Sequence, residues 1–295
     1  MVHEHLPVLL EEVTEFLHPH PGGIYVDGTL GGAGHALKTL ERSSPTGRLI
    51  GIDRDKEAIE WARKRLKPYG GRITIIHGNF SHLREIVGRL NIGKVDGILL
   101  DLGISYQQLA DAARGFSFQS EGPLDMRMDR TQGEPASKLI NTLPREELEG
   151  ILRRFGEGRW ARRIARAIVR YRGKTPILTT TQLSDIISSA VLKPPRRIHP
   201  ATKAFQAIRI AVNDELENLR RAIRDGIPLL KSGGRICVIS FHSLEDRIVK
   251  ETFRHYEKPL ELITVITKKP ISPSTGQIRE NPRARSARLR IAERV

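Results

Sequence analysis

Carboxylates and glycines at the ends of short apolar runs are the residues of this chain best suited to chemistry. Asp27 ends the run Ile24-Tyr25-Val26, and the turn that follows it holds glycines at 28, 31, 32 and 34. Asp53 and Asp101 end two further apolar runs. Glycine lets a ligand approach the backbone, and a carboxylate after the second strand of such folds binds ribose hydroxyls. The pattern predicts a site for an adenosine-containing cofactor.

Alternating strands and helices would bring these carboxylates to one place. Strand-like runs end at residues 27, 53, 76 and 101, and helical patterns separate them. Such alternation predicts right-handed βαβ units and a parallel sheet covered by helices on both faces.

The alternation is interrupted in the middle of the chain. Residues from about 108 to 205 show helical or loop-like patterns without a convincing strand. A helix at 207–224 and a strand at 234–240 then follow, and the runs 262–266 and 287–291 are expected to pair as closing antiparallel strands. The simplest architecture is one α/β domain with a helical insertion of about a hundred residues.

A nicotinamide dehydrogenase and a methyltransferase both place a glycine loop after the first strand. The usual dehydrogenase fingerprint is G-x-G-x-x-G, whereas Gly28, Gly31 and Gly34 are spaced three apart. In methyltransferases that use S-adenosylmethionine the first strand typically ends in an acidic residue, as it does at Asp27. Phe80 would then border the adenine and stack on it, although a core aromatic is an equally good reading.

Composition and charge narrow the class of protein. Lysine and arginine total 49 against 34 acidic residues, which gives a net charge of +15. This charge favours a polyanionic partner, and nucleic acid is the partner we expect. Cys237 is the only cysteine and lies in an apolar run, so it is predicted to be a packed strand thiol. No apolar run approaches the roughly 20 residues that span a bilayer, and the N-terminus lacks a secretory pattern. We expect a cytoplasmic protein with no membrane contact.

The insertion contains the densest basic stretch. Residues 151–174 carry nine basic side chains and one acidic, Glu157. On a helix from Trp160 onward, one face would be apolar, with Trp160, Ile164, Ile168 and Tyr171. A second face would be basic, with Arg159, Arg163, Arg166 and Arg170. This predicts an RNA-facing surface, the alternative being a solvated face over the insertion's own core.

Two other segments repeat the basic bias. The tail from Lys268 onward is rich in arginine, and Lys193–Arg197 reads as a stiff basic connector back to the sheet.

Long, unusual strings of residues connect the chain to a known family. They lie at 5–10, 27–35, 96–105, 114–118, 122–129, 199–202, 205–207, 240–247 and 281–286. With them the chain resembles the bacterial 16S rRNA cytosine-N4 methyltransferase family over nearly its whole length. The resemblance implies a Rossmann-like class I methyltransferase sheet with an inserted α-helical domain. The methyltransferase domain would comprise 1–107 and 207–295, and the inserted RNA-facing domain 108–206.

The resemblance also implies a reaction and a set of site residues. It implies methyl transfer from S-adenosyl-L-methionine to the exocyclic N4 of one cytidine in the decoding region of 16S rRNA, either as free rRNA or in the small ribosomal subunit. It places the cofactor on Ala33, Gly34, His35, Asp53, Phe80, Asp101 and Gln108, which leaves Asp27 and Gly28 mainly to shape the turn. The alternatives are a non-catalytic small-subunit assembly factor and a nicotinamide-dependent dehydrogenase. The oligomeric state, including a dimer, is left open.

The catalytic group is less well defined by the sequence. Wider amino-methyltransferases commonly carry an aromatic after two prolines behind the fourth strand, and here that slot reads Asp101-Leu102-Gly103-Ile104-Ser105. Asp101 is the best-placed acceptor for the amine proton. Asp125 or a residue near His242 could serve instead, and His242 has an equally good structural reading.

Two further features have competing readings. The loop 122–129 would either close over the substrate, which we favour, or form a salt-bridged hinge. The histidines at 3, 5, 18 and 20 lack the ligand spacing of a zinc site, so no metal is expected.

Overall fold

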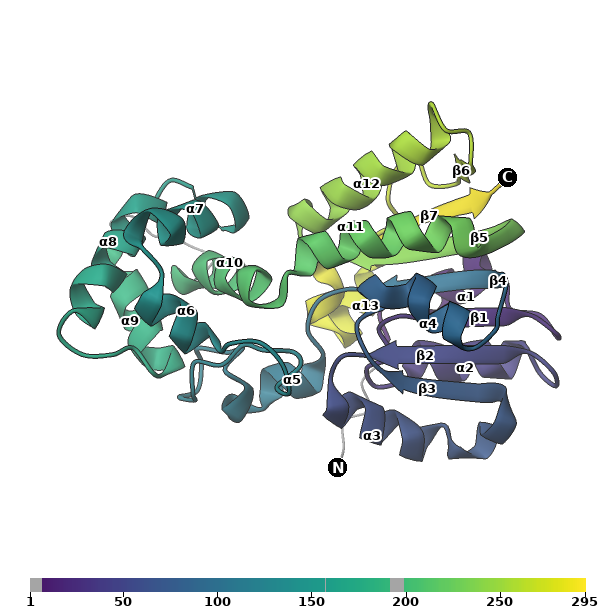
Figure 1. Ribbon diagram of the computed structural model, residues 1–295, viewed down its shortest axis with the longest axis horizontal. Helices are drawn as coiled ribbons and strands as arrows, with labels where there is room; N and C mark the ends of the chain where they lie inside the picture. The colour runs from purple at the N-terminus through teal and green to yellow at the C-terminus, as the bar shows by residue number, and fades with distance from the viewer. Residues whose placement is uncertain (1–6, 157, 192–198) are drawn as a thin grey trace. The chain divides into compact units, whose positions relative to one another are not determined.

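The computed structural model describes residues 7–156, 158–191 and 199–295, and Figure 1 shows its helices and strands. The chain divides into two compact units. The first comprises residues 1–103 and 216–295, and the second comprises residues 104–215. The predicted connector Lys193–Arg197 and the histidines at 3 and 5 lie outside the described residues.

The first unit is built on a seven-stranded sheet in the order β3-β2-β1-β4-β5-β7-β6. The first five strands of this order are parallel, and β7 runs antiparallel to both β5 and β6. The predicted antiparallel closing pair therefore forms, but its register differs from the predicted runs. β6 pairs with residues 292–294, and residues 288–291 pair with β5. The strands are β1 Ile24–Asp27, β2 Arg48–Asp53, β3 Ile73–His77, β4 Val95–Asp101, β5 Leu230–Ser240, β6 Ile263–Val265 and β7 Arg288–Arg294.

Helices cover both faces of this sheet because alternate strand residues point to opposite sides. Leu99 and Cys237 share a core with buried residues of α1, α2 and α3. On the other face, a Cβ built on Gly226 of α11 would lie 3.2 Å from Ile98 and 3.3 Å from Leu83 of α4. The helices of this unit are α1 Leu10–Leu17, α2 Gly34–Arg42, α3 Lys56–Arg65, α4 Leu83–Arg89, α11 Glu215–Gly226, α12 Ser243–Glu257 and α13 Thr275–Glu280.

Cys237 is fully buried in β5, as its apolar surroundings in the sequence predict. Burial raises the pKa of its thiol to about 12, against a small opposing effect of Arg235. The thiol is therefore an inert core group.

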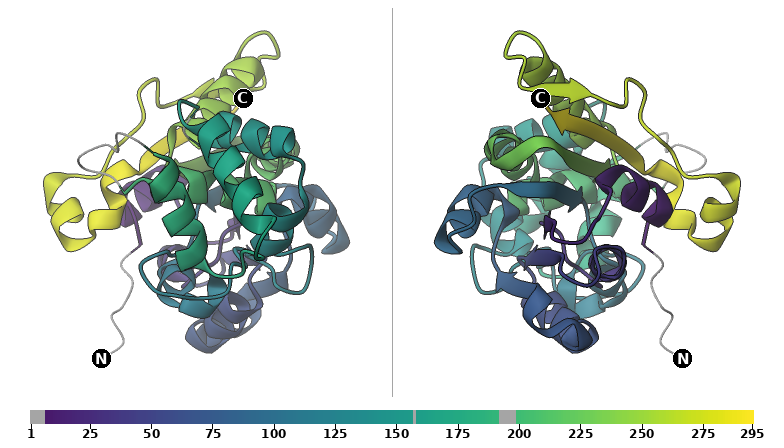
Figure 2. Two further views of the ribbon diagram at one scale, coloured as in Figure 1. Left: turned by 90° about the vertical axis from the view of Figure 1, so that its left-hand side faces the viewer. Right: turned by 90° about the vertical axis from the view of Figure 1, so that its right-hand side faces the viewer.

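The second unit is helical and has its own apolar core. Its core includes Leu148, Ile164, Ile168, Ile187 and Phe205. Figure 2 shows these helices, in teal to green, gathered side by side. They are α5 Tyr106–Ala110, α6 Ala136–Thr142, α7 Arg145–Phe155, α8 Ala161–Arg172, α9 Thr180–Ala190 and α10 Ala201–Asn213.

Two sequence-based expectations about helices were wrong. The expected single helix at 207–224 is two helices, α10 and α11, because Asp214 between them adopts a left-handed conformation with φ +48°. The expected apolar stripe of α8 is also incomplete: Ile164 and Ile168 are buried, but Tyr171 is 38% exposed. No helix among the described residues has the length and apolar character that crossing a bilayer requires.

The loop 122–129 is fixed within the second unit by buried polar side chains. The Asn213 amide accepts a hydrogen bond from Met128 N (2.8 Å) and donates one to Met126 O (2.8 Å). Arg114 is 2% exposed and donates to Met128 O at 2.9 Å. Asp125 and Arg127 form the ion pair of the hinge reading. These bonds hold the loop in one conformation, so they favour the hinge over a closing lid.

Replacing Asn213 by leucine should destabilise the second unit, because Met126 O and Met128 N would lose their hydrogen bonds to the Asn213 amide. We expect the free energy of unfolding to fall by about 3 kcal/mol, measured by urea denaturation. Hydrogen exchange at residues 126–128 should accelerate in the same variant. Gln107→Leu, at an exposed position of α5, is the matched control and should unfold like the parent. Equal midpoints for both variants would show that Asn213 does not hold the loop.

Candidate cofactor and catalytic site

The turn after β1 is held by side-chain acceptors at the carboxyl edge of the sheet. Asp27 is buried and accepts a hydrogen bond from Thr29 N at 3.1 Å. Thr29 Oγ1 in turn accepts one from Asp101 N at 2.6 Å. Thr29 thereby ties the end of β1 to the end of β4. This role of Thr29 was not predicted from the sequence, although a threonine directly after Asp27-Gly28 was the available signal.

Gly28 is needed because three chain segments meet at it. A Cβ built there would lie 2.6 Å from Leu100 Cδ2 and 3.1 Å from Phe80 Cβ, closer than packed carbons approach. The absence of a side chain thus allows Phe80, in the short 3₁₀ turn after β3, to lie against the β1 loop. Phe80 is half-buried rather than part of the inner core.

Asp53 supports the middle of the same loop. One carboxylate oxygen accepts from Gly31 N (2.7 Å) and the other from Asp55 N (2.8 Å). Each oxygen keeps a further lone pair for an incoming donor such as a ribose hydroxyl. Arg65 holds the neighbouring peptide by donating to Gly32 O at 2.7 Å.

The first turn of α2 forms the next wall of the site. Ala33 is buried and has φ +59°, which turns the chain sharply into the helix. Gly34 allows close packing of Pro7, whose Cγ would lie 2.2 Å from an added Cβ. The first backbone N–H groups of a helix lack intrahelical acceptors, so this turn suits a negatively charged group.

His35 and Asp101 face each other where α2 and β4 meet. His35 Nε2 lies 3.6 Å from Asp101 Oδ2, and their side chains are 7% and 20% exposed. Both ring nitrogens of His35 lack a hydrogen-bond partner among the described residues. The Oδ1 oxygen of Asp101 lacks one as well. Buried polar atoms rarely remain unsatisfied, so this pair marks a place where a polar ligand belongs.

Burial shifts the titration of two carboxyl groups in this site. It raises the pKa of Asp27 to about 6, although His35 and the Thr29 amide partly oppose the shift. It also raises the pKa of Asp53 to about 6, against the opposing hydrogen bonds from Asp55 and Gly31. Both groups therefore change charge close to neutral pH.

Gln108 belongs to the second unit, whereas the other predicted cofactor residues belong to the first. It is buried in the first turn of α5, where its Oε1 accepts from Ser105 N (3.0 Å) and its N–H donates to Ser105 Oγ (3.1 Å). These two bonds form a capping box, which is a structural role. A cofactor contact of Gln108 stays a prediction.

The alternatives to Asp101 were Asp125 or a residue near His242. Asp125 and His242 both make hydrogen bonds within the fold, although His242 Nε2 has no hydrogen-bond partner among the described residues. Burial of Asp125 disfavours its charge, but hydrogen bonds from Arg127 at 2.8 and 3.0 Å outweigh this and lower its pKa. His242 caps α12, because its Nδ1 accepts from Glu245 N at 3.3 Å. The structural reading of His242 is thus supported, and Asp125 is a weaker base than an unpaired carboxylate.

These residues fit S-adenosylmethionine. The two free lone pairs of Asp53 suit ribose hydroxyls, Phe80 offers a ring face for adenine, and the unsatisfied His35–Asp101 pair suits the charged methionine end. The β1 loop has glycines at the positions that a ligand would approach, so no side chain keeps the ligand away from the backbone there.

The sheet order with an antiparallel β7, together with this site, defines a class I methyltransferase that uses S-adenosylmethionine. A model of the MraW methylase family matches residues 2–295, and the chain belongs to that family.

Relatives of this chain carry one name. The ribosomal RNA small subunit methyltransferase H of Geotalea uraniireducens (strain Rf4) is 51% identical over 310 residues, which cover 99% of this chain and 98% of that protein. The protein of the same name from Geobacter sulfurreducens is 50% identical over 314 residues and 100% of both chains. That of Symbiobacterium thermophilum is 47% identical over 311 residues, 100% of this chain and 98% of its own.

A solved rRNA methylase from Streptococcus thermophilus is a more distant match. It is 10% identical, with a TM-score of 0.46, over 97% of this chain and 93% of its own. The order of the strands, rather than this overall likeness, identifies the fold class.

Asp27→Asn should make the free energy of unfolding of the ligand-free protein less dependent on pH. The folded-state pKa of Asp27 lies above its ordinary value of 3.8, so the native state holds the extra proton and loses stability as pH rises from about 4 to 6. The shift of about two pKa units corresponds to about 3 kcal/mol, at 1.36 kcal/mol per unit. Above pH 6 the charged Asp27 should therefore lower the free energy of unfolding of the parent by this amount, compared with a neutral group at the same position. The stability of the variant relative to the parent should therefore rise over this window and then level off. Urea denaturation between pH 4 and 7.5 measures it, with Glu60→Gln as an exposed control; parallel curves for Asp27→Asn and the parent would refute the prediction.

Asp53→Asn should weaken cofactor binding and remove its pH dependence around 6. Below the raised pKa the carboxyl is protonated and offers fewer acceptors, so the Kd of the parent should fall as pH rises through 6. The loss of charge-assisted hydrogen bonds should raise the Kd at pH 7.5 about 10- to 100-fold. Calorimetry with both S-adenosylmethionine and S-adenosylhomocysteine tests this, because the two ligands share the ribose. A variant that keeps the pH dependence of the parent would assign the titration to another group.

Proposed function

We propose that the protein transfers a methyl group from S-adenosylmethionine to the exocyclic N4 of a cytidine in the 16S rRNA of the small ribosomal subunit. Membership of the MraW methylase family and the full-length relatives named for small-subunit rRNA methylation support this. The structural observation that supports it most directly is the unsatisfied His35–Asp101 pair at the carboxyl end of β4. The net charge of +15 suits an RNA substrate, and we place the reaction in the cytoplasm.

We further propose which residues hold the cofactor. Asp53 would accept the ribose hydroxyls and Phe80 would cover the adenine. Ala33, Gly34 and His35 would bind the methionine end with backbone and imidazole groups, and Asp101 would complete that end of the site. When bound, the cofactor supplies an electrophilic methyl group on a sulfonium. Gln108 is retained as a contact from the second unit.

The chemistry that remains for the protein is orientation and proton removal. The N4 lone pair of cytosine is delocalised into the ring, so the amine is a weak nucleophile. An acceptor that binds one N–H favours a more pyramidal nitrogen, which attacks the methyl carbon while the C–S electron pair passes to sulfur. The acceptor then takes the released proton, and alignment of nitrogen, carbon and sulfur supplies much of the rate.

Asp101 is the acceptor that we assign. Its Oδ1 has no hydrogen-bond partner among the described residues, and its backbone is fixed through Thr29. Asp125, by contrast, is bound to Arg127 through both carboxylate oxygens.

The product identifies the reaction. Small subunits that lack the modification should gain N4-methylcytidine when incubated with the protein and S-adenosylmethionine, as read by mass spectrometry of their nucleosides. A C5-methylated product, or no transfer to either subunits or free 16S rRNA, would refute the proposed function.

Asp101→Asn should lower kcat about 10²- to 10⁴-fold at saturating cofactor, because an amide cannot take up the amine proton. Binding of small subunits should be retained, which separates a catalytic defect from the loss of an assembly factor. Glu251→Gln, at an exposed carboxylate of α12, is the control and should be fully active. A kcat near that of the parent would remove Asp101 as the acceptor.

A further inference from the structure

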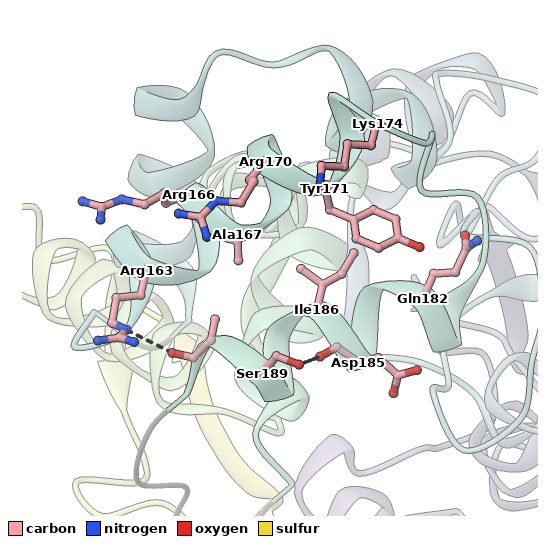
Figure 3. A pocket seen from close by; sticks show the side chains of 11 residues that line it. Arg163, Arg166, Ala167, Arg170, Tyr171, Lys174, Gln182, Asp185, Ile186 and Ser189 are labelled. Carbon is pink, nitrogen blue, oxygen red and sulfur yellow. Dashed lines mark hydrogen bonds between the residues drawn. The ribbon is translucent and has the colours of Figure 1, made fainter.

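Helices α8 and α9 of the second unit enclose a groove of about 690 Å³. Its α8 side carries four cations, Arg163, Arg166, Arg170 and Lys174, and its α9 side carries Gln182, Asp185 and Ser189. Figure 3 shows the three arginines on one side of the groove and Asp185 on the other. The groove therefore has a basic wall and a polar wall with one acid.

The basic wall offers charges that the fold does not use. Arg166, Arg170 and Lys174 are exposed, and none has a hydrogen-bond or ion-pair partner in the described part of the chain. Arg166 and Arg170 are four residues apart on α8, so they are about 6 Å apart along the helix at 1.5 Å per residue, and Lys174 follows just after the helix ends at Arg172. This spacing is similar to that of consecutive phosphates along a nucleic acid strand.

Other arginines of α8 are structural, which sets these cations apart. Arg172 donates to Ile140 O and Leu143 O at 2.6 Å each and so caps α6. Arg163 Nε donates to Ala190 O at 3.2 Å and joins α8 to α9, and its guanidinium lies over the Trp160 ring, 5.9 Å from the ring centroid. The sequence alone shows no difference between these two arginines and the free ones.

Tyr171 supplies an aromatic surface inside the groove. Its ring is 38% exposed and lies beside Ile186 and Ala167 rather than in the core of the unit. An exposed aromatic beside unpaired cations is the combination that single-stranded nucleic acid binds, since bases stack on the ring while phosphates contact the cations.

Asp185 gives the groove a direction. A carboxylate repels phosphates, so a strand in the groove would place its backbone along α8 and its bases toward Tyr171 and α9. Gln182 and Ser189 on that wall can form hydrogen bonds with base edges.

We propose that this groove binds a single-stranded segment of the rRNA substrate, with phosphates on Arg166, Arg170 and Lys174 and a base stacked on Tyr171. This proposal rests on the proposed function and adds a second contact region to it, within the insertion. The groove has the volume of a small-molecule pocket, which admits a short stretch of one strand but not a duplex. An anionic membrane would not require the ring of Tyr171 in the groove lining.

The test uses the full-length protein and a fluorescein-labelled, single-stranded oligoribonucleotide of mixed sequence. Arg166→Glu with Arg170→Glu should raise its Kd at least tenfold. In a neutralising pair, Arg166→Gln with Arg170→Gln, the slope of log K against log salt should become shallower by about 1.4, at 0.7 per phosphate contact for a single strand. Tyr171→Ala should raise the Kd about tenfold, and Tyr171→Phe, which keeps the ring, should bind like the parent.

The matched control is Arg154→Glu with Arg162→Glu. It makes the same change in charge at exposed positions of α7 and α8 that do not line the groove. An equal loss of affinity in this control would show that only net charge matters and would overturn the groove. Two further results would overturn the proposal. One is that the parent binds the duplex form of the probe as tightly as the single strand. The other is that the groove variants lose affinity for anionic vesicles but keep their affinity for RNA.

Two readouts keep the groove and the proposed function separate. Calorimetry with S-adenosylmethionine reports whether each variant is folded, and methylation of small subunits by the parent reports the proposed function. A parent that methylates normally, with groove variants that bind RNA like the control, refutes the groove alone. A parent that does not methylate, with groove variants that lose RNA binding, refutes the function alone.

Discussion

The first unit depends on hydrogen bonds that side chains at the strand ends accept from backbone N–H groups in and around the β1 loop. The glycines of the loop leave side chains out so that a ligand can approach, and only Leu30 and Ala33 of the loop pack in the core of the unit. Asp27, Thr29 and Asp53 add to that packing by accepting the amides of Thr29, Asp101 and Gly31. The same carboxylates are thus structural before they bind anything. Because Asp27 and Asp53 support the loop from inside the fold, they are buried, and this burial raises their pKa values to about 6.

The fold of the first unit could be predicted from the sequence because period and chemistry agree there. The first four parallel strands along the chain are short runs, mostly apolar, that end at a polar residue, and the closing strands 263–265 and 288–294 are antiparallel neighbours as expected. What failed was decided by single backbone angles or by tertiary packing. Asp214 breaks an otherwise continuous helical pattern with one left-handed residue. Tyr171 matches the apolar period of α8, yet it lies where α8 and α9 leave a groove open.

The same limit applies to polar residues that act at long range in the sequence. Asn213 and Arg114 hold a loop from either side of it, and nothing local in their surroundings marks them. Arginines show the problem most clearly, because Arg172 completes a helix end while Arg170, two residues earlier, is exposed and has no partner among the described residues. Composition can count such cations, but only packing decides which of them are available to a polyanion.

The burial of the chain's only thiol has a practical consequence. Cys237 is fully covered in β5 and its thiol stays protonated far above neutral pH, so maleimide reagents should not reach it in the folded protein. A cysteine introduced at an exposed position such as Ser189 would then be the one reactive thiol, with no need to remove the native residue. Site-specific fluorophores or spin labels can therefore be attached to either unit, and distances between the units can be followed in solution.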